Sequence, residues 1–370
     1  MPISCSAVLS ACTQAVELAN SRGGHWQLTV VRDGHVLVDE NSGGAAQDGL
    51  FWGWSTSKAF VTILTWQLIE EGVLGLDDAL IDWWPKFADG DDRKKQVRIR
   101  HVLAHRSGLP SGVGGLAADG LTMHDWQTSI RRLELARLHR PPGARAAYQT
   151  LSYGFLLGEV IRRATGMELP ELYRQRIFTP VGMGDSYLGL TDDQLDRAIP
   201  MQIGKALGRI PQAVVNTQRV RQAVIPAAGI STTSADLARL FNALANDWQA
   251  KGEVDDDSPA TLLRAATLRC ATTPTNDVDV PDATTHMYTR WSQGFQLGGE
   301  PFGHPTRQPF GALSSELAFG HNGSNAAVCW HDPANGLTLG YVSNVMRNPI
   351  FDGDLVRDIA DVFHRALAEH

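Results

Sequence analysis

The sequence is poor in lysine, poor in cysteine and free of long apolar runs. Lysine accounts for only six of its 370 residues, and the net charge is −7. Its densest cationic run, at positions 93–95, directly follows Asp89, Asp91 and Asp92, a pattern typical of a solvated loop. Proteins that bind nucleic acids need clustered cations to neutralise phosphates, so we expect no nucleic-acid partner. A membrane-spanning helix needs about 20 apolar residues, and the lack of such a run predicts no membrane partner.

The four cysteines stand alone in the sequence. They occupy positions 5, 12, 270 and 329 and form no Cys-x-x-Cys pair, which favours buried thiols over a disulfide framework. The first residues lack the cationic start of a secretory signal, and Gln14 and Glu17 interrupt any apolar stretch there. We therefore expect a protein of a reducing compartment, the cytoplasm. The composition leaves open whether it forms a homo-oligomer.

Strand patterns lie near both ends of the chain, and helical patterns fill its middle. Alternating apolar residues predict a hairpin over residues 27–39, with its turn at Asp33-Gly34. Gly72 and Gly166 predict helix ends, and Thr233 predicts a helix start. Apolar spacing predicts the remaining elements: strands over 317–319, 326–330 and 337–342, and helices over 4–21, 55–71, 151–164, 234–245 and 355–367.

This order of elements predicts an α+β fold with one antiparallel sheet. Residues 1–60 and 250–370 would form the sheet and its flanking terminal helices, and residues 61–249 would form a mostly helical domain inserted between them. Ligand sites favour the junction of two such parts, so we expect the functional site in the groove between them.

Ser55 and Lys58 open the helix predicted over residues 55–71. A helix places residues i and i+3 on one face, so backbone geometry alone holds the amine beside the hydroxyl. A free lysine, with a pKa of about 10.4, is a poor base at neutral pH, but a desolvated pocket lowers that pKa. The amine can then accept the serine proton, while the N–H groups of the helix start stabilise charge on an attacked carbonyl oxygen. The pair therefore predicts a serine nucleophile.

A bare Ser-x-x-Lys pattern also fits a serine that caps a helix beside an unrelated surface lysine. Two features favour the catalytic interpretation. Lys58 is the only lysine with a serine three residues before it. Its neighbours in the sequence are apolar or aromatic: Phe51, Trp52, Trp54, Ala59, Phe60 and Val61. A lysine among such residues does not belong to an ordinary solvated face.

Two other patterns are weaker. His101 and His105 are spaced as in zinc-binding helices, but the residues between them lack the glutamate that such chemistry needs. Gly53 and the residues that follow it half-match the nucleophile turn of α/β-hydrolases, but the second glycine is missing. We therefore expect no metal and no other cofactor.

Around Ser55-Thr-Ser-Lys58 the sequence resembles the serine β-lactamase and penicillin-binding-protein superfamily. Within its broader set, which includes class C β-lactamases, D-aminopeptidases and acyltransferases, the chain is most similar to family VIII carboxylesterases. The resemblance extends in order over five segments: 51–80, 97–109, 142–159, 226–237 and 319–323. It implies the α+β fold described above and catalysis without a cofactor.

The resemblance implies roles for residues far from the nucleophile. The phenolic oxygen of Tyr148 would face Ser55 and share a proton path with Lys58, acting as base and then as acid. Tyr153 is the main alternative, and we expect it to pack in the core. Among six tyrosines, Tyr148 is favoured by the match of its flanking residues.

His321-Asn322-Gly323 occupies the position of the family's Lys-Thr-Gly or His-x-Gly motif. The resemblance implies that the N–H groups of Ser55 and Ser324 form the oxyanion hole. Gly323 would let the substrate approach the backbone closely, and His321 would polarise Tyr148 or bind the substrate.

Thr150 departs from the family, because many β-lactamases carry there an asparagine that binds a substrate amide. Threonine cannot present that donor and acceptor pair, so Thr150 either contacts the substrate differently or caps the following helix. Many relatives also have a lysine that binds the carboxylate of a β-lactam, and His321 takes its place in this sequence.

Both departures favour an esterase, and we expect a hydrolase that cleaves small carboxylic esters through an acyl-enzyme on Ser55. Four alternatives stay open with the same site: a β-lactamase, a D-amino-acid amidase, a D-amino-acid peptidase and an acyltransferase. A non-catalytic binding protein on this fold and a metal-dependent hydrolase are the alternatives of other classes.

Overall fold

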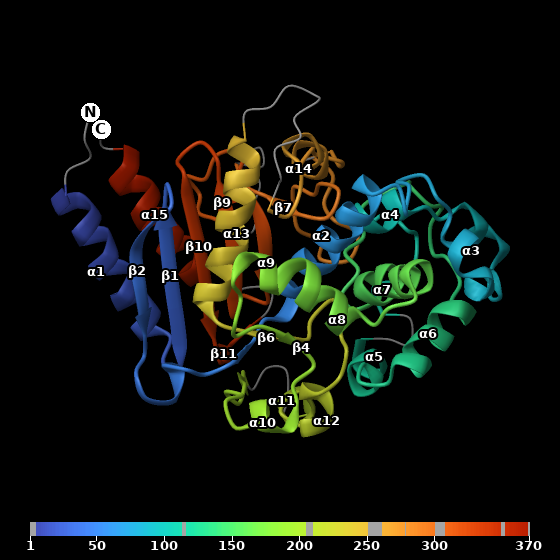
Figure 1. Ribbon diagram of the computed structural model, residues 1–370, viewed down its shortest axis with the longest axis horizontal. Helices are drawn as coiled ribbons and strands as arrows, with labels where there is room; N and C mark the ends of the chain where they lie inside the picture. Colours follow the sequence, from blue (N-terminus) through green and yellow to red (C-terminus); the bar gives the residue numbers. More distant parts are fainter. Residues whose placement is uncertain are drawn as a thin grey trace.

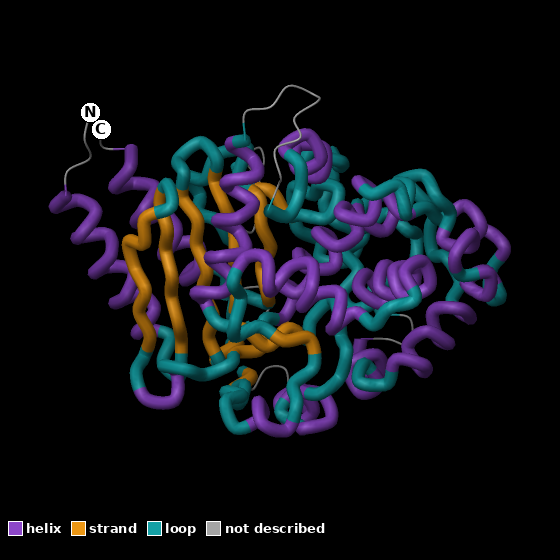
Figure 2. Tube along the Cα trace, in the orientation of Figure 1, coloured by secondary structure: helices purple, strands orange, loops and turns teal. Residues whose placement is uncertain are grey.

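The protein is described by a computed structural model over residues 5–112, 116–204, 210–250, 261–277, 279–299, 308–348 and 352–368. A six-stranded antiparallel sheet with the order β2-β1-β10-β9-β8-β7 is its main feature (Figure 2). Its strands are β1 (Trp26–Arg32), β2 (His35–Asn41), β7 (Gln296–Leu297), β8 (Phe319–Gly323), β9 (Ala327–Asp332) and β10 (Leu337–Ser343). Strands from the two ends of the chain pair with each other at β1 and β10, which confirms the predicted α+β class.

The predicted hairpin forms between β1 and β2. Asp33 and Gly34 both have positive φ angles, 47° and 80°, which suits a two-residue hairpin turn with the twist of the flanking strands. Most of β1 is buried, whereas β2 is largely exposed. The difference arises because β1 pairs on both sides and β2 is an edge strand.

Two layers of helix cover the sheet. On one face, α1 (Cys5–Ser21) and α15 (Asp354–Ala368), the first and last helices of the described chain, pack on each other (Figure 1). Leu28 and Val30 of β1 join the apolar cluster that these helices form with the sheet. On the other face lies α13 (Ser234–Gln249), which packs on β1, β9 and β10. Because side chains alternate along a strand, Gln27 and Thr29 face α13.

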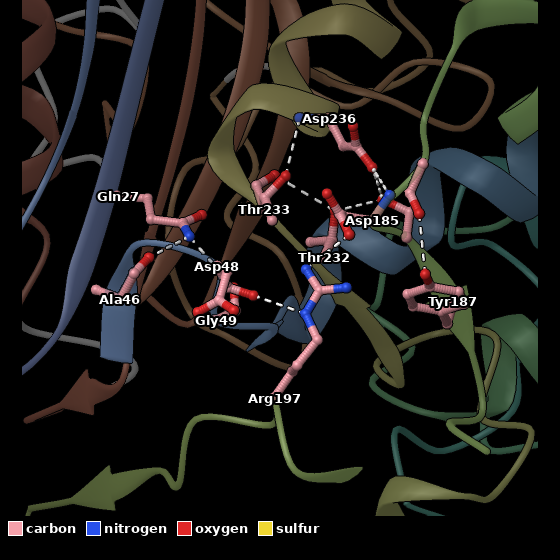
Figure 3. Close-up of polar contacts among 12 residues, drawn as sticks. Gln27, Ala46, Asp48, Gly49, Asp185, Tyr187, Arg197, Thr232, Thr233 and Asp236 are labelled. Atoms are coloured by element: carbon pink, nitrogen blue, oxygen red, sulfur yellow. Dashed lines mark hydrogen bonds and ion pairs between the residues drawn. The ribbon is translucent and has the colours of Figure 1, made fainter. Parts of the chain in front are cut away.

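Buried polar groups fasten α13 to the rest of the molecule (Figure 3). The amide of Gln27 donates to the carbonyls of Ala46 and Gly49 and accepts the N–H of Ser234. Thr233 caps the helix by accepting the N–H of Asp236, as predicted for this start. These hydrogen bonds thus join the hairpin, the turn at residues 46–49 and the start of α13.

The middle of the chain is mostly helical (Figure 1). Its helices are α2 (Ser57–Glu70), α3 (Leu80–Trp83), α4 (Ile99–Leu103), α5 (Leu116–Thr122), α6 (Trp126–Leu135), α7 (Ser152–Thr165), α8 (Leu169–Tyr173), α9 (Thr179–Val181), α10 (Asp192–Leu195), α11 (Ile210–Val215) and α12 (Gln218–Arg221), followed later by α14 (Ala265–Ala271). Two small sheets lie among them: β3 (Phe51–Trp52), β6 (Ile230–Thr232) and β4 (Tyr187–Leu188) in one, and β5 (Gln202–Ile203) and β11 (Val345–Met346) in the other. Gly72 and Gly166 follow α2 and α7 with positive φ angles, as predicted for helix ends.

Several details differ from the sequence predictions. Helix α13 lies in the range predicted for the inserted helical domain but packs on the sheet; the domain boundaries themselves stay a prediction. Strand β8 begins at Phe319, and Leu317 before it is half exposed. Cys329 is buried as expected, but Cys12 is only half-buried and Cys270 is exposed, because its short helix α14 turns that side outward. The side chain of Cys5 lies outside the described residues.

Within the described ranges, no helix combines the length and the apolar character that crossing a bilayer requires.

Candidate active site

A tight turn between β3 and α2 presents Ser55. After Gly53, a single 3-10 turn spans Trp54–Thr56 and runs directly into α2. Trp54 has a φ of 50°, a strained conformation for a bulky residue. Hydrogen bonds hold the turn in place: Ser57 Oγ donates to the Trp54 carbonyl over 2.6 Å and accepts the N–H of Ile230 over 3.1 Å. The surrounding structure therefore fixes where the Ser55 hydroxyl points.

Lys58 is fully buried beside Ser55. Its Nζ lies 3.0 Å from Ser55 Oγ, 2.8 Å from the Thr150 carbonyl oxygen and 3.1 Å from that of Ala227. No carboxylate among the described residues pairs with it. Burial without a counter-charge lowers the pKa of Lys58 well below its ordinary value. The amine is thus shifted toward the neutral form that can accept a proton.

Tyr148 approaches Ser55 from the segment before α7, 93 residues along the chain. Its hydroxyl donates to Ser55 Oγ over 2.7 Å, and Lys58 Nζ lies 4.9 Å from the centre of its ring. The structure therefore brings Ser55, Lys58 and Tyr148 together in one hydrogen-bonded group. Ser55 is only 9% exposed, so this group is largely shielded from solvent.

Tyr153 packs in the core, as expected. It is fully buried, and its hydroxyl is 2.6 Å from Thr62 Oγ1. Burial raises the pKa of this phenol, so it stays protonated. It belongs to the wall behind Tyr148, since the ring of His105 contacts both tyrosines.

Strand β8 passes very close to the turn that carries Ser55. A Cβ atom added to Gly323 would lie 2.4 Å from the Gly53 carbonyl oxygen and 3.1 Å from Trp54 Cβ. Only glycine permits this approach, and it places the backbone of the following residue, Ser324, beside the turn. Ser324 itself has a positive φ of 54°. Its part in an oxyanion hole stays a prediction.

His321 is buried in β8 near Tyr148, with their ring centres 6.3 Å apart. Its Nδ1 is 3.0 Å from the Asn322 carbonyl oxygen, which can only accept, so Nδ1 carries the proton. Nε2 is buried and has no hydrogen-bond partner among the described residues. Burial and the nearby Lys58 lower the pKa of His321 to about 3, and the ring is therefore neutral at physiological pH.

Thr150 does not cap the helix that follows it. Helix α7 begins at Ser152, and the residue before it, Leu151, makes no side-chain cap. Instead, Thr150 Oγ1 lies 2.8 Å from Ser111 Oγ, while its carbonyl oxygen binds Lys58. The capping alternative was wrong because this hydroxyl has a tertiary partner that sequence patterns cannot reveal. Substrate contact by Thr150 stays a prediction.

His101 and His105 have separate partners. His101 Nδ1 accepts the N–H of Arg98, whereas His105 Nδ1 accepts the N–H of Gln149 and its ring packs beside Tyr148. Within the described residues, no three His, Cys, Asp or Glu side chains gather as a metal-binding group.

A family profile described as Beta-lactamase matches residues 22–362. The chain belongs to the β-lactamase family. This result confirms the resemblance and the fold predicted from the motifs. The family is one of serine hydrolases, and the catalytic roles of Ser55, Lys58 and Tyr148 stay predictions.

Individual relatives in this β-lactamase family have different activities in their names. The chain is 26% identical over 355 residues to a putative D-alanyl-D-alanine carboxypeptidase of Escherichia coli, covering 88% of this chain and 76% of the relative. It is 25% identical over 364 residues to the esterase/beta-lactamase LipL of Mycobacterium tuberculosis, covering 89% and 79%. A penicillin-binding protein homolog from Caulobacter crescentus has a similar structure, with a TM-score of 0.79, 26% identity and coverage of 98% and 97% of the two chains.

Sequence reasoning missed two side chains beside Tyr148. Trp291 stacks on its ring, with centres 5.3 Å apart and planes 9° from parallel, and Asp282 accepts its backbone N–H. The chain has ten tryptophans, and nothing in the sequence singles out Trp291 among them. Asp282 had no signal either, since 134 residues separate it from Tyr148.

Proposed function

We propose that this member of the β-lactamase family is a carboxylesterase that cleaves small carboxylic esters through an acyl-enzyme on Ser55. Neutral Lys58 can donate its two hydrogens to the carbonyls of Thr150 and Ala227, which leaves its lone pair for the Ser55 hydroxyl. Lys58 accepts the serine proton as Ser55 Oγ attacks the acyl carbon. This arrangement activates the serine without a histidine.

Tyr148 completes the proton path. As the tetrahedral intermediate collapses, the bond to the alcohol oxygen breaks and Tyr148 gives that oxygen its proton. The Lys58 ammonium then returns a proton to the phenolate, which leaves both groups as they began. Water repeats the sequence: as its oxygen attacks the acyl carbon, Tyr148 accepts its proton and passes the phenol proton to Lys58. The Lys58 ammonium then protonates Ser55 Oγ as the acyl bond breaks, which leaves all three groups as they began.

Two backbone N–H groups would hold the oxyanion in both steps. Ser55 lies in the first turn of its helix, where N–H groups lack helical acceptors. The approach of Gly323 to the Gly53 carbonyl supports the assignment of the Ser324 N–H as the second donor. One such donor typically accounts for about 10²–10³ in rate.

The neutral state of His321 is the observation that favours an ester over a β-lactam or a peptide carboxylate. With a pKa of about 3, this ring offers no positive charge to a substrate carboxylate at physiological pH. The pairing of Thr150 with Ser111 points the same way, because that hydroxyl already has a partner. The relative LipL, named an esterase/beta-lactamase, supports an esterase but does not separate it from a β-lactamase, and the carboxypeptidase relative keeps the peptidase alternative open.

A substrate panel with the purified protein tests the proposal. It compares kcat/KM for p-nitrophenyl acetate and butyrate, nitrocefin and a D-alanyl amide, with Ser55→Ala as the inactive control. We expect the esters to give the highest kcat/KM, and no loss of activity with a chelator. Fast turnover of nitrocefin or the amide with negligible ester cleavage would overturn the esterase assignment.

Mass analysis after treatment with a fluorophosphonate tests the nucleophile directly. We expect one adduct, on Ser55, and none in Ser55→Ala. Folded protein that forms no adduct on Ser55 would instead support a non-catalytic binding protein.

A further inference from the structure

Tyr148 lies in a segment without regular secondary structure. No helix or strand hydrogen bonds fix residues 146–149, so other groups must hold this backbone. The N–H of Ala147 donates to the His105 carbonyl over 2.8 Å, and the N–H of Gln149 donates to His105 Nδ1 over 3.3 Å. The N–H of Tyr148, between them, donates to both oxygens of Asp282, over 3.1 and 2.9 Å.

Asp282 is a buried carboxylate, 1% exposed, held by N–H donors. Besides Tyr148, it accepts the backbone N–H groups of Thr284 and Thr285, over 2.8 and 3.0 Å. It also accepts Nε1–H of Trp291 over 3.2 Å. No lysine, arginine or histidine among the described residues forms an ion pair with it. The burial of a carboxylate is costly, and here backbone and indole N–H groups offset that cost.

The same carboxylate fixes two parts of the environment of Tyr148. One oxygen binds both the Tyr148 N–H and the indole N–H of Trp291, and the indole ring stacks on the phenol ring. The contact of Asp282 with the Tyr148 N–H therefore fixes the position of the Tyr148 backbone. Its contact with Trp291 fixes the indole ring against which the phenol ring stacks. Together they determine how far the phenolic oxygen reaches toward Ser55.

We propose that Asp282 is a positioning residue that holds the Tyr148 phenol within hydrogen-bond reach of Ser55, acting through the Tyr148 backbone and through Trp291. The inference rests on the proposed function, because it takes Tyr148 as the proton carrier. A displacement of about 1 Å at a reacting group can cost roughly 100-fold in rate, so a side chain that never touches substrate can control kcat.

The experiment compares Asp282→Asn with the unaltered protein, using whichever acyl donor of the substrate panel is turned over fastest. Asparagine keeps the shape but replaces one acceptor oxygen with an amide that repels the N–H groups facing it. We expect kcat to fall up to roughly 100-fold with KM nearly unchanged. Trp291→Phe keeps an aromatic ring beside Tyr148 and leaves the Asp282 contact with the Tyr148 N–H in place, so its loss of kcat should be smaller.

Asp247→Asn is the matched control. Asp247 is also a buried carboxylate, and it accepts the backbone N–H groups of Thr261, Leu262 and Leu263. It lies near the end of α13 and contacts no residue of the Ser55 group. We expect Asp247→Asn to lower the thermal midpoint while kcat stays unchanged at temperatures where the protein is folded.

A double-mutant cycle with Tyr148→Phe separates positioning from general damage. If Asp282 acts through Tyr148, Asp282→Asn lowers kcat in the unaltered protein but hardly changes the residual rate of Tyr148→Phe. An equal loss in both backgrounds, or no loss in either, would overturn the positioning role. Failure of the proposed function appears differently: Tyr148→Phe itself would then retain full kcat, or no acyl donor would be turned over.

Discussion

Lys58 is the residue whose chemistry depends most on its surroundings. Its three oxygen neighbours are one hydroxyl and two backbone carbonyls, and none of them carries a charge. Carbonyl oxygens satisfy the amine hydrogens without stabilising the ammonium form as a carboxylate would. The lowered pKa of Lys58 follows from this combination of full burial and neutral partners.

The pH dependence of activity tests this description of Lys58. Its pKa in the folded protein lies below the ordinary value, and the neutral amine is the active form. Consequently kcat/KM should rise with pH through that lowered pKa and then level off. His321, with a pKa of about 3, stays neutral over this range and adds no step. The measurement is kcat/KM for p-nitrophenyl acetate between pH 5 and 9, corrected for spontaneous hydrolysis.

The control for the pH profile is Lys58→Arg, which stays protonated at every pH tested. We expect it to lose about 10²–10⁴ in kcat/KM throughout, with no rise toward high pH. A variant that keeps the same rising limb would show that another group produces it.

Two neighbouring tyrosines provide a paired test. Tyr148→Phe removes the hydroxyl that contacts Ser55, so we expect kcat to fall by about 10² or more and stability to change little. Tyr153→Phe removes the bond to Thr62, so we expect a loss of about 1 kcal/mol in unfolding free energy and an unchanged kcat. Urea unfolding and ester kinetics on both variants check the pair; the opposite assignment would make Tyr153 the proton carrier.

At the scale of elements, the site depends on the approach of β8 to the turn before α2. These two elements come from opposite ends of the chain, and Gly323 is where their backbones meet. The 3-10 turn that runs into α2 supplies the spacing of Ser55 and Lys58, while the end of β8 positions the backbone of Ser324. Neither element forms the proposed oxyanion hole alone.

Gly323→Ala should push β8 away from the turn that carries Ser55. Its new Cβ would lie 2.4 Å from the Gly53 carbonyl, so one backbone must shift. We expect a loss of about 1–3 kcal/mol in stability and a fall in kcat of roughly 100-fold. Circular dichroism melting and ester kinetics measure the two effects.

Gly72→Ala, at the far end of α2, is the control for that substitution. Gly72 has a φ of 70°, but a Cβ there meets nothing within 4 Å. It should cost about 1 kcal/mol in stability through backbone strain alone and leave kcat unchanged. Equal losses of kcat in both variants would contradict a special contact at Gly323.

At the scale of the whole molecule, polar links join the sheet, α13 and the segment that leads to the nucleophile. Gln27 lies at the centre of these links and is 6% exposed. It contacts a turn at residues 46–49 on one side (Figure 3). On the other side it accepts the N–H of Ser234 at the start of α13. One of its three hydrogen bonds, to Ser234, joins residues that are 207 positions apart.

Gln27→Leu should destabilise the whole fold without changing the site. Leucine leaves two carbonyls and one N–H buried without their partner, which costs about 3 kcal/mol in total. We expect a thermal midpoint several degrees lower and an unchanged kcat below the transition. Gln14→Leu on the exposed side of α1 should shift stability by less than about 0.5 kcal/mol. Equal effects of the two substitutions would show that the buried links contribute little.

The local sequence determined the features that depend on neighbouring residues. The pairing of Ser55 with Lys58 follows from helical spacing, the hairpin follows from Asp33-Gly34, and the start of α13 follows from Thr233. Each depends on the geometry of a few consecutive residues, so a short pattern suffices to predict it. The resemblance to the family extended this to Tyr148, which local geometry could not place.

Only the tertiary structure decided what surrounds these residues. The burial that lowers the pKa of Lys58, the pairing of Thr150 with Ser111 and the contact of Asp282 with Tyr148 all join distant segments. Whether α13 packs on the sheet or on the helices likewise depends on which apolar face meets it. Such contacts depend on how whole elements pack, and that packing is a property of the complete fold rather than of any short pattern.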